Sequence, residues 1–115
     1  MTNQVIIQMA KELKRASTKN DAPIWGKLAE YALKPAAARR DINLYKIGQI
    51  TKENDTVVFP GKVLGTGNIP HKITLFAFSI SDSAADKIMK SGGKLITYSN
   101  LIEKNPTGKG VVLLG

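Results

Sequence analysis

Few side chains in this sequence have the chemistry that catalysis or metal binding needs. His71 is the only histidine among the 115 residues and there is no cysteine, so two-histidine and thiolate metal sites are both excluded. A serine–histidine–carboxylate triad would have to use His71, and no serine lies in a G-x-S-x-G turn. We therefore predict that the chain is not an enzyme, needs no cofactor and has no small-molecule substrate.

His71 itself lies in a turn, Asn68 to Lys72, that leads into a strand. Two interpretations of this side chain stay open. The ring either hydrogen-bonds to the backbone of its own turn, or it contacts a phosphate or a ribose beside Lys72.

The glycine-rich stretch from Gly61 to Gly67 is the second candidate chemical feature. A phosphate-binding P-loop places its Gly-Lys-Ser/Thr at the end of the glycine series, where a helix begins. Here Gly61-Lys62 comes first and strand-forming residues follow, and no helix is expected after Gly67. A small nucleotide-dependent enzyme is therefore the weaker hypothesis. Gly61, Gly65 and Gly67 either form ordinary turns or let a nucleic-acid backbone approach closely.

Positive charge is the strongest signal in the composition. Lys and Arg number 17 against 9 Asp and Glu, which gives a formal net charge of +8. Such an excess usually accompanies a polyanionic partner, most often nucleic acid. Adjacent arginines can grip phosphates or stack on bases; the alternative is a solvated loop, with lysines protecting an exposed strand edge. The excess is greatest between residues 31 and 72, where the basic residues are Lys34, Arg39, Arg40, Lys46, Lys52, Lys62 and Lys72.

Helical periodicity dominates the first third of the chain. Apolar residues recur at three and four positions over residues 3–17, which predicts an amphipathic helix. Asp21 can cap a second helix that has Pro23 in its first turn and ends at Lys34-Pro35. A short third helix is expected over Tyr45 to Ile50, where Tyr45 could stack on a base or simply pack.

The rest of the sequence alternates strands and helices. Strands are predicted at 56–59 and 62–64, separated by Pro60-Gly61, and at 73–80, 94–97 and 111–114. Helices are predicted at 81–91 and 99–104. Ser81 or Ser83 would cap the first of these, Met89 would lie on its buried face, and Gly92-Gly93 would end it. The order strand, helix, strand favours parallel pairing in an α/β fold, with the strand at 73–80 buried on both faces.

Five ordered blocks of the sequence resemble one ribosomal protein family. The blocks are RRDINLYKI at 39–47, TVVFPGKVLG at 56–65, HKIT at 71–74, SGGKLIT at 91–97 and NPTGKGVVL at 105–113. The family is the archaeal and eukaryotic large-subunit ribosomal protein eighteen-e, which is related to the bacterial large-subunit ribosomal protein fifteen.

The resemblance implies an irregular β-β-α superhelix-like core with the N-terminal helices packed against it. It also implies a cytoplasmic, structural constituent of the large ribosomal subunit, whose partners are large-subunit ribosomal RNA and neighbouring ribosomal proteins. The end of the chain at Gly115, without the longer basic tail of eukaryotic members, points to an archaeal version, and residues 35–38 carry less positive charge than the family loop. With Lys34 from the charged stretch, the expected RNA contacts are Lys34, Arg39, Arg40, Lys46, Lys62, His71, Lys72 and Lys109, on a surface shaped by Gly61, Gly65 and Gly67.

Two further expectations concern organisation and an alternative function. Residues 1–34 are expected to form a helix pair, and residues 35–115 an RNA-binding core that is compact together with it. The alternative function is a protein-interaction module that uses the N-terminal amphipathic helix. No signal peptide is expected, and no apolar window is long enough to span a membrane.

Overall fold

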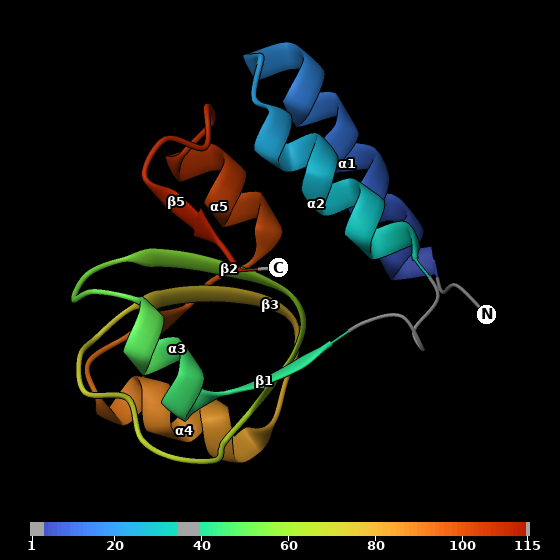
Figure 1. The fold of residues 1–115 in the computed structure, drawn as a ribbon. Helices are drawn as coiled ribbons and strands as arrows, with labels where there is room; N and C mark the ends of the chain where they lie inside the picture. The colour runs from blue at the N-terminus through green and yellow to red at the C-terminus, as the bar shows by residue number, and fades with distance from the viewer. Residues whose placement is uncertain (1–3, 35–39, 115) are drawn as a thin grey trace. The chain divides into compact units, whose positions relative to one another are not determined.

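The computed structural model describes residues 4–34 and 40–114, which form two compact units (Figure 1). The first unit contains residues 1–39 together with Tyr98–Lys109. The second contains Arg40–Thr97 together with residues 110–115. Each unit is therefore built from two separate stretches of sequence. The predicted division at residue 34 stays a prediction.

The first unit is helical. Helices α1 (Gln4–Asn20) and α2 (Pro23–Leu33) lie side by side and antiparallel, as the predicted helix pair requires (Figure 1). A third helix, α5 (Tyr98–Lys104), belongs to the same unit. The apolar spacing of α1 and α2 buries their facing side chains, which is why both segments are helices in water. The largest buried side chains of this unit are Leu13, Trp25, Leu28 and Leu101.

Two side-chain contacts join distant segments of the helical unit. The indole Nε1 of Trp25 donates to the carbonyl of Pro106 at 2.7 Å. The hydroxyl of Tyr98 bonds to the carboxylate of Glu12, and this bond, followed by burial and the negative charge of Glu12, raises the pKa of Tyr98. The other contribution, a bond with Ser99, lowers the pKa. These contacts connect the start of α5 to α1 and the turn after α5 to α2.

The predicted cap of α2 is wrong. The N-cap is Ala22, which makes no side-chain hydrogen bond, and Asp21 lies before it with a φ of 49°. Asp tolerates this left-handed conformation better than most residues do, so Asp21 serves the turn between the helices instead. Pro23 lies in the first turn of α2, as predicted.

The second unit is a parallel sheet with helices packed against it, which confirms the predicted α/β fold. Its long strands are β2 (Thr56–Leu64) and β3 (Thr74–Ile80), which pair along one edge of β2. Along the other edge, β2 pairs with both β1 (Asp41–Asn43) and β5 (Val111–Leu113). Strand β4 (Lys94–Leu95) pairs with β3. All four pairings are parallel, because each strand is reached through a crossover.

Two helices of this unit share a core with the sheet. They are α3 (Leu44–Ile50) and α4 (Asp82–Lys90). The side chain of Asn43 caps α3 and Ser81, the first of the two predicted candidates, caps α4. Gly92, with a φ of 89°, follows the last turn of α4 as predicted. The core is formed by Leu44, Ile47, Val57, Phe59, Val63, Ile69, Ile73, Leu75, Ala84 and Ile88.

Several details of the sheet differ from the prediction. Strand β2 is continuous through Pro60-Gly61, because one extra residue between Phe59 and Lys62 forms a bulge that accommodates the proline. Strand β3 is buried on both faces at Leu75 and Phe76, but its later part is partly exposed. Met89 is 63 % exposed rather than on the buried face of α4.

Candidate nucleic-acid interface

The predicted contact residues fall in both units. Lys34 and Lys109 belong to the helical unit, whereas Arg40, Lys46, Lys62, His71 and Lys72 belong to the sheet unit. Arg39 lies outside the described residues. All of the described ones are exposed except His71, which is half-buried. The sheet unit therefore carries five of the eight predicted contacts.

Arg40, the residue before β1, lies next to Lys62 of β2. The backbone N–H of Lys62 donates to the carbonyl of Arg40 at 3.1 Å. This close approach explains Gly61, because a Cβ at that position would collide with the Arg40 carbonyl and with the ring of Phe59. Gly61 thus lies inside a strand and not in the predicted turn. Its function is to let the chain that enters β1 approach β2, which places Arg40 beside Lys62.

Gly65 and Gly67 form a loop whose carbonyls are held by a lysine. The ammonium of Lys87 donates to the carbonyl of Gly65 at 2.6 Å and to that of Gly67 at 2.8 Å. Gly67 has a φ of 83°, and its Cα faces Tyr45 so closely that a Cβ would clash. A phosphate cradle needs N–H groups aimed at its ligand, whereas this loop aims two carbonyls at a cation. The geometry favours a structural loop.

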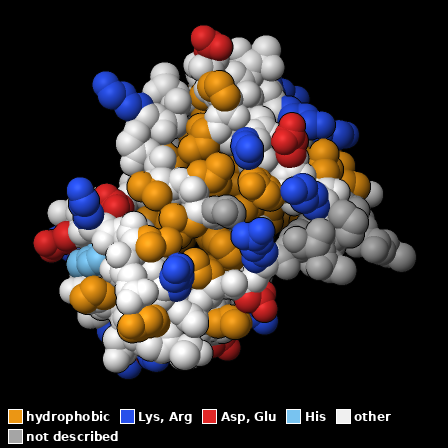
Figure 2. Space-filling view, viewed as in Figure 1, with side chains coloured by type: hydrophobic (Ala, Val, Ile, Leu, Met, Phe, Trp, Pro, Cys, Tyr) orange, Lys and Arg blue, Asp and Glu red, His pale blue; other side chains and the backbone are white. Residues whose placement is uncertain are grey.

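His71 is hydrogen-bonded to a side chain and not to the backbone of its turn. Its Nε2 lies 2.9 Å from the hydroxyl of Thr51, which itself donates to the carbonyl of Ile47 at 2.7 Å. A hydroxyl has one proton, so the Thr51 oxygen must accept from Nε2–H. In the neutral ring Nδ1 is then an acceptor. The ring is the pale-blue side chain at the surface in Figure 2.

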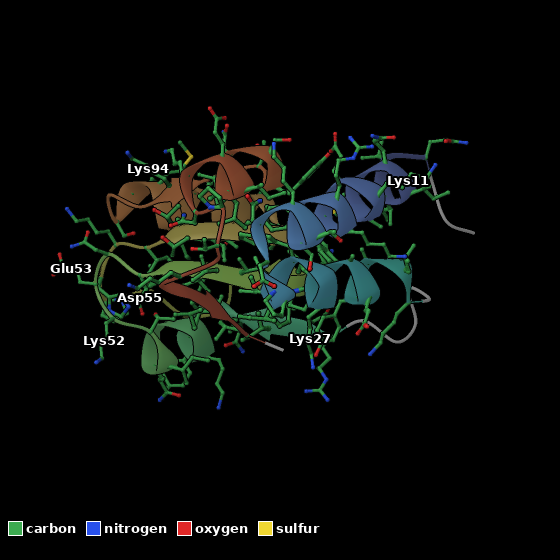
Figure 3. All side chains as sticks on the ribbon, turned by 90° about the horizontal axis from the view of Figure 1, so that it is seen from above. Lys11, Lys27, Lys52, Glu53, Asp55 and Lys94 are labelled. Atoms are coloured by element: carbon green, nitrogen blue, oxygen red, sulfur yellow. The ribbon has the colours of Figure 1, made fainter. Side chains whose placement is uncertain are left out.

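Lys72 borders a small polar hollow of about 210 Å³ together with Lys94, which is not among the predicted contacts. Two backbone bonds place these lysines: Asn54 N–H donates to the Lys72 carbonyl at 2.8 Å, and Lys94 N–H donates to that of Ile73 at 2.9 Å. The hollow is also lined by Gly92 and Gly93, and Figure 3 shows Lys94 at the same end of the sheet unit as Lys52, Glu53 and Asp55. A hollow lined by two lysines suits a phosphate.

Several basic side chains of the sheet unit are available to an anion. Within residues 4–34 and 40–114 the ion pair that the structure records joins Lys90 to Asp86 at 2.9 Å. Arg40, Lys46, Lys62, Lys72 and Lys94 have no carboxylate partner there. Lys34 differs, since its ammonium lies 4.7 Å from the centre of the Tyr31 ring.

Neither a metal site nor a membrane span is found in the described part of the chain. No three carboxylate or imidazole side chains gather there in a way that could hold a metal ion. Among the same residues, no helix combines the length and the apolar character needed to cross a bilayer.

Comparison with known proteins places these features in a family. The family model described as "Ribosomal protein 60S L18 and 50S L18e" matches residues 6–115. A protein of Sulfurisphaera tokodaii named large ribosomal subunit protein eL18 is 45 % identical over 106 residues, which cover 92 % of this chain and 90 % of the relative. A protein of the same name from Archaeoglobus fulgidus is 38 % identical over 113 residues, covering 98 % of this chain and 97 % of the relative. The match thus confirms the resemblance, and the chain belongs to the family of ribosomal proteins 60S L18 and 50S L18e.

Proposed function

We propose that this chain is a cytoplasmic structural constituent of the large ribosomal subunit and that it binds large-subunit ribosomal RNA through a basic surface. The family and its archaeal relatives, which are named as large-subunit proteins, support the ribosomal role. Membership of a ribosomal protein family also bears out the prediction that the chain is not an enzyme. Neighbouring proteins of the large subunit are further proposed partners.

The observation that carries the RNA-binding proposal is the set of unpaired cations on the sheet unit. An isolated protein gains little from lysines and arginines without counter-ions, and it bears the cost of their mutual repulsion. Arg40 beside Lys62, with Lys72 and Lys94 around one hollow, could neutralise phosphates on a folded RNA. Such contacts read the shape of the RNA and only weakly its sequence.

His71 has a narrower role in this proposal. Because Nε2 donates to Thr51, the neutral ring offers only Nδ1, which accepts hydrogen bonds. A ribose 2′-hydroxyl can donate to that nitrogen, whereas an unprotonated phosphate cannot. We therefore propose a ribose contact at His71 and phosphate contacts at the lysines beside it.

Filter binding of the full chain to purified large-subunit ribosomal RNA tests the proposal. If about six cations each neutralise a phosphate, affinity should fall roughly a thousandfold between about 50 and 200 mM salt. Reversing two charges, in Lys62→Glu with Lys72→Glu, should make the fall of log affinity with log salt less steep, by about 2 in the slope. The matched control is Lys11→Glu with Lys27→Glu, which makes the same change of net charge on exposed residues of the helical unit (Figure 3). A flat salt response, or equal losses in both variants, would contradict the proposal.

For the alternative function, protein interaction through α1, this helix exposes fewer apolar side chains than its sequence predicts. Met9, Leu13 and Ala16 of this helix are buried, so most of its apolar face packs inside the unit. Among the described residues of α1, Val5 is the large apolar side chain that stays exposed, at 73 %. Loss of binding to a ribosomal protein neighbour in Val5→Ser, with RNA binding unchanged, would support the alternative.

A further inference from the structure

The edge of β2 opposite β3 is shared by two short strands with a gap between them. Strand β5 pairs with Thr56–Val58, and β1 pairs with Lys62–Leu64. Among the described residues, none pairs as a strand on that edge with the β2 residues between them, 59–61. Pro60 lies in the middle of this gap, and proline has no N–H that a missing strand would leave unsatisfied. Proline is therefore well suited to this unpaired part of the edge.

A hollow opens at this gap, and we call it the edge pocket. Its volume is about 450 Å³, within the range of roughly 300–1,000 Å³ typical of sites that hold small organic groups. Its lining residues come from β1, α3, β2 and the end of the β5 segment, all in the sheet unit. They are Arg40, Asp41, Ile42, Lys46, Ile50, Phe59, Leu113 and Leu114.

The apolar residues of the edge pocket are suited to a flat ring. Ile42, Leu113 and Leu114 are half-buried and Phe59 is 4 % exposed, so they form a fixed surface. Ile50, at the end of α3, is 47 % exposed although it borders the pocket. An exposed isoleucine beside other apolar groups gains free energy when a ligand covers it. The pocket thus offers an apolar surface that the described residues of the sheet unit leave partly exposed, most of all at Ile50.

The charged residues at the edge pocket decide which ring fits. Arg40 and Lys46 are exposed and make no ion pair among the described residues, so both can hold a phosphate. Asp41 is the third charged residue of the lining and is also exposed. A carboxylate repels phosphate, but it accepts hydrogen bonds from the exocyclic amino group of a base. Two cations, one acceptor and an apolar surface match a nucleotide better than a peptide.

We propose that the edge pocket binds one unstacked base of the RNA, with Arg40 and Lys46 on its flanking phosphates and Asp41 accepting from its amino group. This inference rests on the proposed RNA-binding function. Proteins commonly recognise RNA sequence by drawing single bases out of loops and bulges onto apolar or aromatic side chains. The pocket would add a base-selective contact to a surface that otherwise reads phosphates, and it favours adenine, cytosine or guanine over uracil.

Methyl NMR of the full chain tests the proposal with three tetramers as probes: oligoadenosine, oligouridine and an abasic oligomer with the same phosphates. Oligoadenosine should shift the methyl signals of Ile42, Ile50, Leu113 and Leu114 and leave Met89 unchanged. Oligouridine should bind several-fold more weakly, and the abasic oligomer should leave these methyls unshifted. Signals that move with protein concentration alone would indicate a second copy as occupant and overturn the proposal.

Two variants with the same change of charge distinguish binding in the edge pocket from general electrostatic attraction of the oligomer. Ile50→Glu should weaken oligoadenosine binding about tenfold, because it removes one apolar wall and adds a charge that repels phosphate. Met89→Glu makes the same charge change at an exposed apolar residue of α4 and should have little effect. Equal losses of oligoadenosine affinity in both variants, or methyl shifts with the abasic oligomer equal to those with oligoadenosine, would overturn the proposal of base binding. If the ribosomal RNA itself still binds with its salt dependence, the proposed function survives that result.

Discussion

The hydroxyl oxygen of Thr51 lies 2.9 Å from Nε2 of His71 and accepts the ring's N–H, because its own proton goes to the carbonyl of Ile47. Thr51 is buried, so this small network joins the end of α3 to the turn that precedes β3. The relationship fixes both the tautomer and the orientation of the one histidine in the chain.

Thr51→Val should therefore destabilise the protein. The change keeps the shape of the side chain but leaves the Ile47 carbonyl and the ring N–H without their partner, which should cost about 1–3 kcal/mol of unfolding free energy. Thr18→Val is the matched control, since the Thr18 hydroxyl makes an exposed bond of 3.3 Å to Lys14 and should change stability by less than about 0.5 kcal/mol. Urea unfolding measures both, and equal losses would contradict the buried network. Nitrogen NMR of the wild-type ring should show the Nε2–H tautomer.

Lys87→Met should loosen the loop from Gly65 to Gly67. The ammonium makes two charge-assisted bonds to loop carbonyls, so its loss should cost about 2 kcal/mol and raise hydrogen exchange at Thr66 and Gly67. Lys90→Met is the control, because Lys90 is on the same helix but makes only an exposed ion pair with Asp86. Such a pair contributes about 0–1 kcal/mol. Unchanged exchange in the loop of Lys87→Met would contradict its role.

Tyr98→Phe should change the response of stability to alkaline pH. The hydrogen bond to Glu12 raises the pKa of Tyr98 in the folded state. The stabilisation is therefore fully present below the unfolded value of about 10 and is lost as the pH rises through the raised folded value. Wild type should lose stability in that range, and Tyr98→Phe, less stable at neutral pH, should lose less. Tyr45→Phe, at an exposed tyrosine, is the control and should follow wild type. Parallel curves for all three would contradict the contribution of the Tyr98 bond.

Sequence patterns predict those helices and strands that are long enough for their apolar residues to recur at a regular spacing. The helix pair, the parallel order and the cap at Ser81 follow from local spacing. Strand β1 cannot be predicted from the sequence, because three residues between a loop and a helix have no period of their own and its pairing depends on Gly61 about twenty residues later. Strand β2 was divided at Pro60 because a bulge depends on the partner strand, which the sequence does not display.

At the candidate site, too, the sequence predicts only what depends on neighbouring residues. The lysines between residues 34 and 72 are predictable, because the local excess of positive charge can be counted from the sequence alone. Lys87 and Lys94 are not, since their importance comes from carbonyls and a hollow contributed by segments some twenty residues away. Asp21 was misassigned because a cap and a left-handed turn residue have the same amino-acid preferences.

The division of each unit between distant segments also sets the order in which the chain can fold. The helical unit includes residues 98–109, and the edge of β2 is incomplete until Val111–Leu113 pairs with it. During synthesis neither unit is therefore complete until the segments after residue 98 have left the ribosome. Until then, part of one edge of β2 lacks its partner strand. A basic chain in that partly folded state is attracted to any RNA nearby.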